Sequence, residues 1–70
     1  MITIAPSLEI QRELLNRQIS DHQQEYWKAT TLAKAYKKAG LDEPAKKQAE
    51  AAASLERVVD ALDEELKALV

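Results

Sequence analysis

The chain contains one histidine, His22, with two carboxylates beside it, Asp21 and Glu25. In a helix, residues three apart share a face, so His22 and Glu25 would point the same way. Two copies of such a helix could surround a metal ion with imidazole and carboxylate ligands, as di-iron bundles do. Those bundles need more inward-facing glutamates than this sequence offers. We therefore predict no metal and no cofactor, and interpret His22 as a polar residue that fixes the register of a helical interface.

Residues suited to other catalysis are scarce. The sequence has no cysteine, and no serine is placed to pair with the only histidine, so no nucleophile–base pair can be assembled. Gly40 is the only glycine, which excludes a glycine-rich phosphate loop. We conclude that the protein is not an enzyme and has no small-molecule substrate.

Five lysines cluster near the middle of the chain and could contact phosphate groups. They are Lys34, Lys37, Lys38, Lys46 and Lys47. Asp42 and Glu43 lie among them, and only Tyr36 could stack nearby on a base. The net charge of −2 also argues against a general polyanion binder. We interpret these lysines as a solvated turn, and the alternative left open is an RNA-binding hairpin dimer that uses this lysine-rich tip.

Two helices are expected to position these residues. Strong helix formers dominate, and one glycine, two prolines and no phenylalanine argue against a sheet. Ser7 is a typical N-cap for a first helix over 7–39. Spacings of four and three predict an apolar seam along one face of this helix. The seam comprises Leu15, Ile19, His22, Tyr26, Ala29, Ala33 and Tyr36, with Leu8 extending it and Arg12 interrupting it.

The first helix could also be divided. Ser20 with Gln23, or Asp21 with Gln24, would form a capping box at which a new helix could begin. The apolar seam continues through these residues without a gap. We therefore expect one continuous helix of about 33 residues, and a break near Ser20 is the alternative.

Gly40 predicts the end of the first helix, because glycine readily adopts the left-handed conformation that follows a C-terminus. We expect a turn over 40–42, Asp42 as the cap of a second helix over 43–69, and Pro44 in its first turn. The second helix has a seam of its own, formed by Ala45, Ala49, Ala52, Leu55, Val59, Leu62, Leu66 and Leu69. The short connection predicts that the two helices are antiparallel neighbours.

Residues 29–52 resemble a tetratricopeptide repeat. The repeat's order of apolar, small, aromatic and turn positions is matched by Leu32, Ala33, Tyr36, Gly40, Ala45, Ala49 and Ala52. The sequence departs from the repeat at Ala29, where tryptophan is favoured, at Ala49, where an aromatic is usual, and at Arg57, where proline is common. Only one copy is present, and a lone repeat cannot bury its own face. The resemblance implies protein–protein interaction by a repeat-like hairpin.

The triplet Ser54-Leu55-Glu56 carries a second resemblance. It is similar to an Ala-Leu-Glu-like step in the second helix of the small needle co-chaperones of type III secretion systems. Those proteins are helical hairpins of similar length. This resemblance implies a helper that shields a secreted helical subunit together with a partner chaperone.

Apolar residues cover more of both helices than a two-helix contact needs. Ala51 and Val58 flank the second seam, and Trp27 lies off the first. A further stripe on the first helix comprises Ile10, Leu14, Leu32, Ala35 and Ala39. Because exposed apolar patches usually mark interfaces, we predict an all-α hairpin that dimerises into a four-helix bundle. The predicted interface comprises Leu15, Ile19, His22, Tyr26, Trp27, Leu55, Val58, Val59, Leu62, Leu66 and Leu69.

Charge placement predicts how the two copies are oriented. Lysines gather at the tip of the hairpin, whereas acidic residues gather at its open end: Glu9, Glu13, Asp60, Asp63, Glu64 and Glu65. An antiparallel homodimer would bring opposite charges together. Exposed pairs contribute about 0–1 kcal/mol each, so they orient the copies rather than hold them.

The predicted role is a small non-catalytic protein–protein interaction module. The alternative is a small chaperone or adaptor that binds a partner helix along the same apolar face. No stretch approaches the roughly 20 apolar residues that span a bilayer, and residues 1–6 do not read as a signal peptide. We expect a cytoplasmic protein with no membrane partner, and residues 1–6 as an N-terminal arm.

Overall fold

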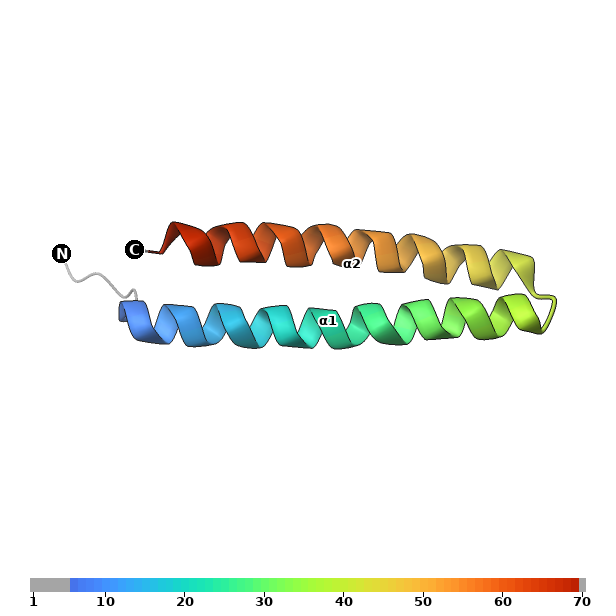
Figure 1. The fold of residues 1–70 in the computed structure, drawn as a ribbon, viewed down its shortest axis with the longest axis horizontal. Coiled ribbons are helices and arrows are strands. Elements are labelled where there is room, and N and C mark those ends of the chain that lie inside the picture. Colours follow the sequence, from blue (N-terminus) through green and yellow to red (C-terminus); the bar gives the residue numbers. More distant parts are fainter. Residues whose placement is uncertain (1–5, 70) are drawn as a thin grey trace.

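The computed structural model describes residues 6–69 of the chain, which form two helices. Helix α1 spans Leu8–Lys38 and helix α2 spans Asp42–Ala68. The helices run antiparallel, with the start of α1 and the end of α2 at one end of the rod and the connection at the other (Figure 1). The predicted all-α hairpin is confirmed. The predicted arm over 1–6 lies outside the described residues, apart from Pro6.

Helix α1 begins after a serine cap. Ser7 has extended backbone angles (φ −60°, ψ 161°), and its Oγ accepts a hydrogen bond from the Ile10 N–H at 3.3 Å. The Gln11 side chain also donates to the Pro6 carbonyl at 2.7 Å. From there α1 continues without interruption through Ser20, so the alternative break is not observed.

Gly40 turns the chain at the end of α1. Its φ of 78° lies in the left-handed region, which glycine adopts without a Cβ penalty. The Gly40 N–H donates to the Lys37 carbonyl at 3.1 Å, and the Leu41 N–H donates to the Tyr36 carbonyl at 2.9 Å. These two bonds form a Schellman motif, which pairs carbonyls that the helix end leaves free.

The prediction that Asp42 caps α2 is wrong. Leu41 occupies the cap position (φ −98°, ψ 79°), and no side chain caps this helix end. Leu41 is also the residue whose N–H completes the Schellman motif. The same residue therefore closes the end of α1 and occupies the N-cap position of α2. Asp42 and Glu43 are instead the first residues within α2, where negative charge favours the helix N-terminus. Pro44 lies in the same first turn.

The two helices meet along their seams, and the most buried seam residues are alanines. Ala29, Ala45 and Ala52 are the buried hydrophobic residues of the described chain. The half-buried seam residues are Gln11, Leu15, Ile19, His22, Ala33 and Tyr36 in α1, Gln48, Leu55, Val59, Leu62 and Leu66 in α2, and Leu69 just after α2. Small side chains near the tip let the backbones approach closely, and larger ones fill the space toward the open end.

Three positions of the predicted seams need correction. Ala49 is exposed, and the half-buried residue at that level is Gln48. Tyr26 is exposed at the edge of the seam, while Gln11 is half-buried one position before Arg12. Ala45, Gln48, Ala52 and Leu55 keep alternating spacings of three and four, so the heptad geometry is retained although one position is polar.

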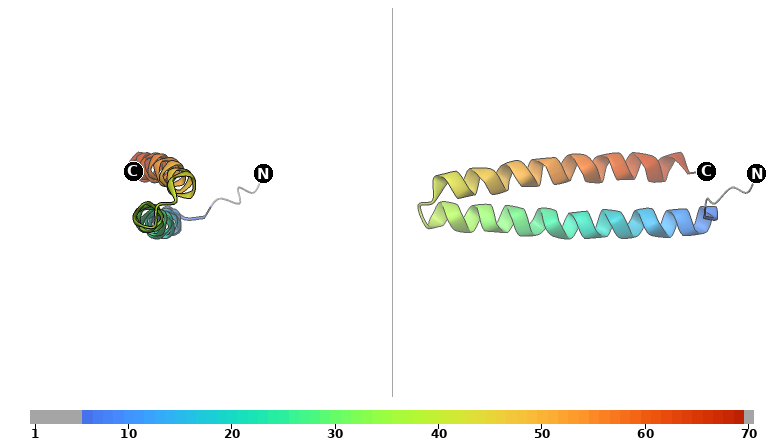
Figure 2. Two further views of the ribbon diagram at one scale, coloured as in Figure 1. Left: turned by 90° about the vertical axis from the view of Figure 1, so that its right-hand side faces the viewer. Right: turned by 180° about the vertical axis from the view of Figure 1, so that it is seen from behind.

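The described hairpin is a single layer of two helices. Its principal extents are 58 × 19 × 15 Å, and the smallest is close to one helix diameter of about 10–12 Å. The end-on view shows one helix beside the other with both broad faces open (Figure 2). No side chain of the described residues is fully buried. Helical domains are stabilised when a second layer covers such a face, and residues 6–69 provide one layer.

Within residues 6–69, neither helix combines the length and apolar character needed to cross a bilayer.

Candidate interaction surface

Large hydrophobic side chains remain exposed along the hairpin. Leu14 is 44% exposed, Leu32 40%, Val58 41% and Trp27 68%. The other exposed large hydrophobic residues are Leu8, Ile10, Tyr26 and Leu41. The larger side chains are therefore more open to solvent than the buried alanines, which is the reverse of a self-sufficient core.

One broad face of the hairpin carries most of these leucine and valine side chains. A hollow at the open end is lined by Gln11, Leu14, Leu15, Gln18, Glu65 and Leu69. A second hollow nearer the tip is lined by Glu25, Lys28, Ala29, Leu32, Gln48, Ala51 and Leu55. Val58 is seven residues from both Ala51 and Glu65 and so shares their side of α2. We call Leu14, Leu32, Ala51, Leu55, Val58 and Leu69 the leucine face.

The other broad face is lined by smaller and more polar side chains. Three hollows adjoin one another here. The middle one shares Ala33, Lys34 and Ala49 with the hollow at the tip, and Tyr26 and Glu56 with the hollow toward the open end, so the three form a continuous groove. Within it, the Thr30 hydroxyl donates to the Tyr26 carbonyl at 2.8 Å. We call it the tyrosine groove. Tyr26 is its one large exposed hydrophobic residue, so it offers less apolar surface than the leucine face.

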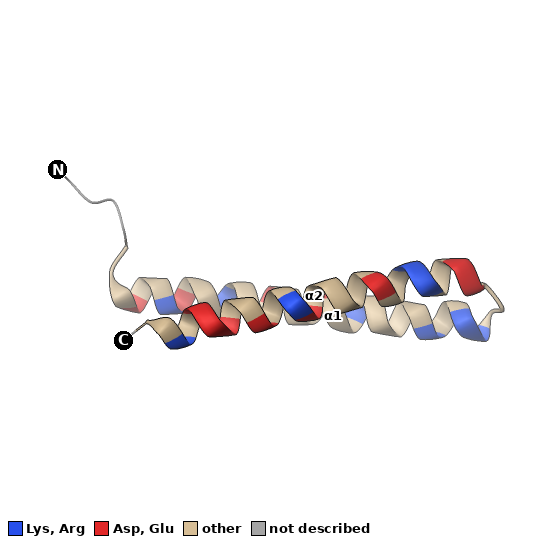
Figure 3. Ribbon diagram, turned by 90° about the horizontal axis from the view of Figure 1, so that it is seen from above, with Lys and Arg blue, Asp and Glu red and all other residues tan. Residues whose placement is uncertain are grey.

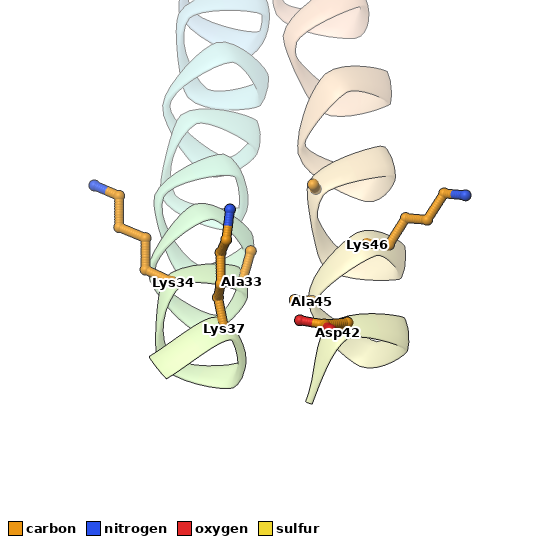
Figure 4. A pocket seen from close by; sticks show the side chains of 7 residues that line it. Ala33, Lys34, Lys37, Asp42, Ala45 and Lys46 are labelled. Carbon is orange, nitrogen blue, oxygen red and sulfur yellow. The ribbon is translucent and has the colours of Figure 1, made fainter. Parts of the chain in front are cut away.

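The lysine-rich tip does not direct its charges toward one point. The hollow at this end is lined by Ala33, Lys34, Lys37, Asp42, Ala45, Lys46 and Ala49. Figure 4 shows the Lys34 and Lys46 side chains pointing away from it in opposite directions, with Asp42 beside its centre. Lys38 and Lys47 are also exposed. A phosphate group would need converging donors, and these side chains diverge.

His22 bonds to its own helix. Its Nδ1 lies 2.7 Å from the Gln18 carbonyl oxygen, and because a carbonyl only accepts, Nδ1 carries the hydrogen in this contact. Glu25 pairs instead with Lys28 at 3.2 Å. Within residues 6–69, no three histidine, aspartate or glutamate side chains are grouped so that they could bind a metal ion. The D-H-x-x-E pattern therefore yields a half-buried seam histidine beside exposed carboxylates.

Charge is unevenly distributed along the rod. Carboxylates are concentrated on the half of α2 nearest its end, and lysines flank the connection (Figure 3). Lys67 Nζ lies 2.9 Å from Asp63 Oδ2. The hydrogen bond that Lys67 donates to Asp63, together with the negative charge of Asp63, raises the pKa of Lys67 above its ordinary value of 10.5. This pair is exposed, so it contributes little to holding the helices together.

The predicted interface divides into two groups in the structure. Leu15, Ile19, His22, Leu55, Val59, Leu62, Leu66 and Leu69 are half-buried between the helices. Tyr26, Trp27 and Val58 are exposed. The predicted interface omitted Leu14, Leu32 and Ala51, although the sequence placed Leu14 and Leu32 on a further apolar stripe of the first helix and Ala51 beside the second seam.

Comparisons with known proteins give no relative from which a role could be inferred. No protein-family model matches the sequence, and no curated protein or solved structure was found to be similar to it.

Proposed function

We propose that the chain is a small non-catalytic interaction module that self-associates through its apolar helix faces into a homodimeric four-helix bundle. The observation that supports this proposal is the burial pattern. The buried hydrophobic residues of the described hairpin are three alanines, while Leu14, Leu32 and Val58 remain 40–44% exposed. A second hairpin over the leucine face would supply the missing layer. The cysteine-free sequence fits a reducing compartment, and we propose the cytoplasm.

The energetic scale favours association through apolar contacts. Complete burial of a leucine or valine side chain contributes about 1.5–3 kcal/mol, so covering a side chain that is 40–44% exposed contributes about 1 kcal/mol. Several such residues and the half-buried seam would be covered together. Exposed ion pairs contribute about 0–1 kcal/mol each and would select the orientation.

Thermal unfolding at several chain concentrations tests self-association, because a folded dimer becomes more stable as its concentration rises. We expect the midpoint, followed by helical circular dichroism, to rise steadily across a hundredfold concentration range. An unchanged midpoint over that range would contradict the proposal.

A second candidate function is a small chaperone or adaptor for a partner helix. The leucine face supports it, because Leu14 and Leu32 lie along one line of α1 and could contact an amphipathic helix laid beside it. The resemblance of Ser54-Leu55-Glu56 to needle co-chaperones favours the same role. A chain that stays monomeric, and gains helicity when a secreted helical subunit is added, would favour this candidate over self-association.

A further inference from the structure

We infer that a second copy of this chain docks on the leucine face in antiparallel order, so that Leu14 of one copy contacts Leu32 of the other and the two Val58 side chains meet at the two-fold axis. This inference rests on the proposed self-association and specifies its geometry. Three features of the described residues lead to it: the spacing of the leucines, the level of Val58 and the distribution of charge.

The first feature is the spacing along α1. Leu14 and Leu32 are eighteen residues apart, which corresponds to five turns of 3.6 residues. They therefore lie on the same side of α1, separated by roughly 27 Å at 1.5 Å per residue. Both are exposed, and they line hollows on the same face. In an isologous contact the same surface is used by both copies. Two leucines on one line suit such a contact, because Leu14 of each copy can then meet Leu32 of the other.

The second feature is the position of Val58 on α2. Gln23 is midway between Leu14 and Leu32 in the sequence. Gln23 lines a common hollow with Glu56 and Val59, which places Val58 near the same level of the rod. The exposed valine of α2 therefore lies opposite the midpoint of the two exposed leucines of α1.

These positions fit one symmetry operation. A two-fold axis that lies between two stacked hairpins, perpendicular to the helices, places each helix over its own copy in reverse direction. When this axis is placed at the level of Val58, Leu14 of each copy meets Leu32 of the other copy. The two Val58 side chains then meet each other at the axis. A two-fold axis parallel to the helices would instead place α2 over the partner's α1. Val58 would then face the region of Asp21 and Glu25, so an apolar side chain would cover carboxylates.

The third feature is charge. The tip over 34–47 carries five lysines and two carboxylates. At the open end, the segments 7–13 and 60–69 together carry six carboxylates against one arginine and one lysine. Antiparallel stacking places each lysine-rich tip beside an acidic open end, whereas the parallel arrangement brings both tips together. Between the leucines, α1 carries two residues of each sign on this face: Arg17, Asp21, Glu25 and Lys28. In the antiparallel order Asp21 of each copy lies over Glu25 of the other, so the centre of the contact brings carboxylates together. The Lys28 side chain, 3.2 Å from Glu25, partly compensates this charge, and the contacts between tip and open end are what favour the antiparallel order.

Cysteine cross-linking tests this geometry, because the chain has no cysteine of its own. Leu14→Cys and Leu32→Cys would be prepared separately, then treated with a short bismaleimide alone and as an equal mixture. We expect cross-linked dimers in the mixture and little product from either variant alone. Val58→Cys is expected to cross-link to itself. Trp27→Cys, on the outer side of α1, is the control and is expected to give little dimer.

The mass of each unlinked variant, measured by light scattering, separates the possible failures. A monomer at every concentration would remove both the proposed self-association and this inference. A dimer in which Leu14→Cys links to itself and the mixture adds no product would overturn the antiparallel order alone. A dimer that links through Trp27→Cys but not through Val58→Cys would overturn the choice of face. Val58→Cys is a small substitution, so this arm remains informative if a leucine variant loses helicity.

Discussion

The Leu41 N–H lies 2.9 Å from the Tyr36 carbonyl oxygen and donates to it across the turn at Gly40. This bond fixes the direction in which α2 leaves α1, and it depends on the φ of 78° at Gly40. A side chain at this position would meet no atom within 4 Å, so space is not the constraint. The backbone conformation is the constraint, because a left-handed residue with a Cβ is strained.

We predict that Gly40→Ala lowers the free energy of unfolding by about 1–2 kcal/mol per chain, the cost of a left-handed L-residue. Asparagine tolerates this conformation better, so Gly40→Asn should lose less. Urea unfolding at one fixed chain concentration measures both variants. Equal stability of Gly40→Ala and the parent chain would show that φ at this position is not what the turn requires.

The cap of α1 offers a comparison of two serines. Ser7→Ala removes the acceptor of the Ile10 N–H and should cost about 1 kcal/mol, as N-cap losses typically do. Ser20→Ala changes an exposed residue inside the same helix and should stabilise it by up to about 0.5 kcal/mol, because alanine is the better helix former. Both are measured by urea unfolding. A loss at Ser20 as large as that at Ser7 would indicate that a helix begins at Ser20.

Two alanines on α2 distinguish the leucine face from the tyrosine groove. Ala51 and Ala53 are both exposed, but Ala51 lines a hollow of the leucine face and Ala53 lines the groove. We predict that Ala51→Glu weakens the dimer by at least about tenfold in dissociation constant, because the added carboxylate would be covered by the second copy beside a residue of like charge. Ala53→Glu is the matched control and should dimerise normally. Sedimentation at equilibrium measures both constants, and equal effects would contradict the assigned face.

The antiparallel geometry also predicts a rescue. Ala51 and Glu65 are each seven residues from Val58, on opposite sides of it. With the two-fold axis at Val58, Ala51 of each chain therefore lies opposite Glu65 of the other chain. The added carboxylate in Ala51→Glu would therefore face Glu65 of the second chain. Combining Ala51→Glu with Glu65→Lys should restore part of the lost affinity, while Ala53→Glu with Glu65→Lys should gain nothing.

The pair of Lys67 and Asp63 predicts a pH effect at the alkaline end. Asp63 raises the pKa of Lys67 above 10.5, so the folded chain holds this proton more tightly than the unfolded chain. The stabilisation is therefore fully present below pH 10.5 and is lost as the pH rises through the folded pKa. Asp63→Asn should be less stable than the parent well below pH 10.5 and equally stable well above the folded pKa.

Nuclear magnetic resonance titration of the Lys67 side chain checks the cause of that effect. In Asp63→Asn the pKa of Lys67 should fall toward 10.5. Glu56→Gln, which removes a carboxylate of the tyrosine groove, should leave the titration of Lys67 as it is in the parent chain. An unchanged Lys67 titration in Asp63→Asn would show that the ion pair does not form in solution.

The fold could be predicted from periodicity and one glycine, because a two-helix contact needs little more than matched seams and a turn. The details that escaped prediction have local causes. Leu41 completes the cap of α1 and is also the N-cap residue of α2, so Asp42 is already inside the second helix and does not cap it. Gln48 occupies a seam position that a search for apolar residues assigns to Ala49. The relation of Leu14 and Leu32 to Val58 required the alignment of α1 with α2, which depends on how the seams interlock.

The solution mass of the parent chain, measured by light scattering over a hundredfold concentration range, tests the central claim most directly. Self-association through the leucine face predicts twice the chain mass of 7.8 kDa, with dissociation only at the lowest concentrations. A mass of one chain throughout, with low helicity, would contradict the homodimer and leave the leucine face open for the helix of another protein.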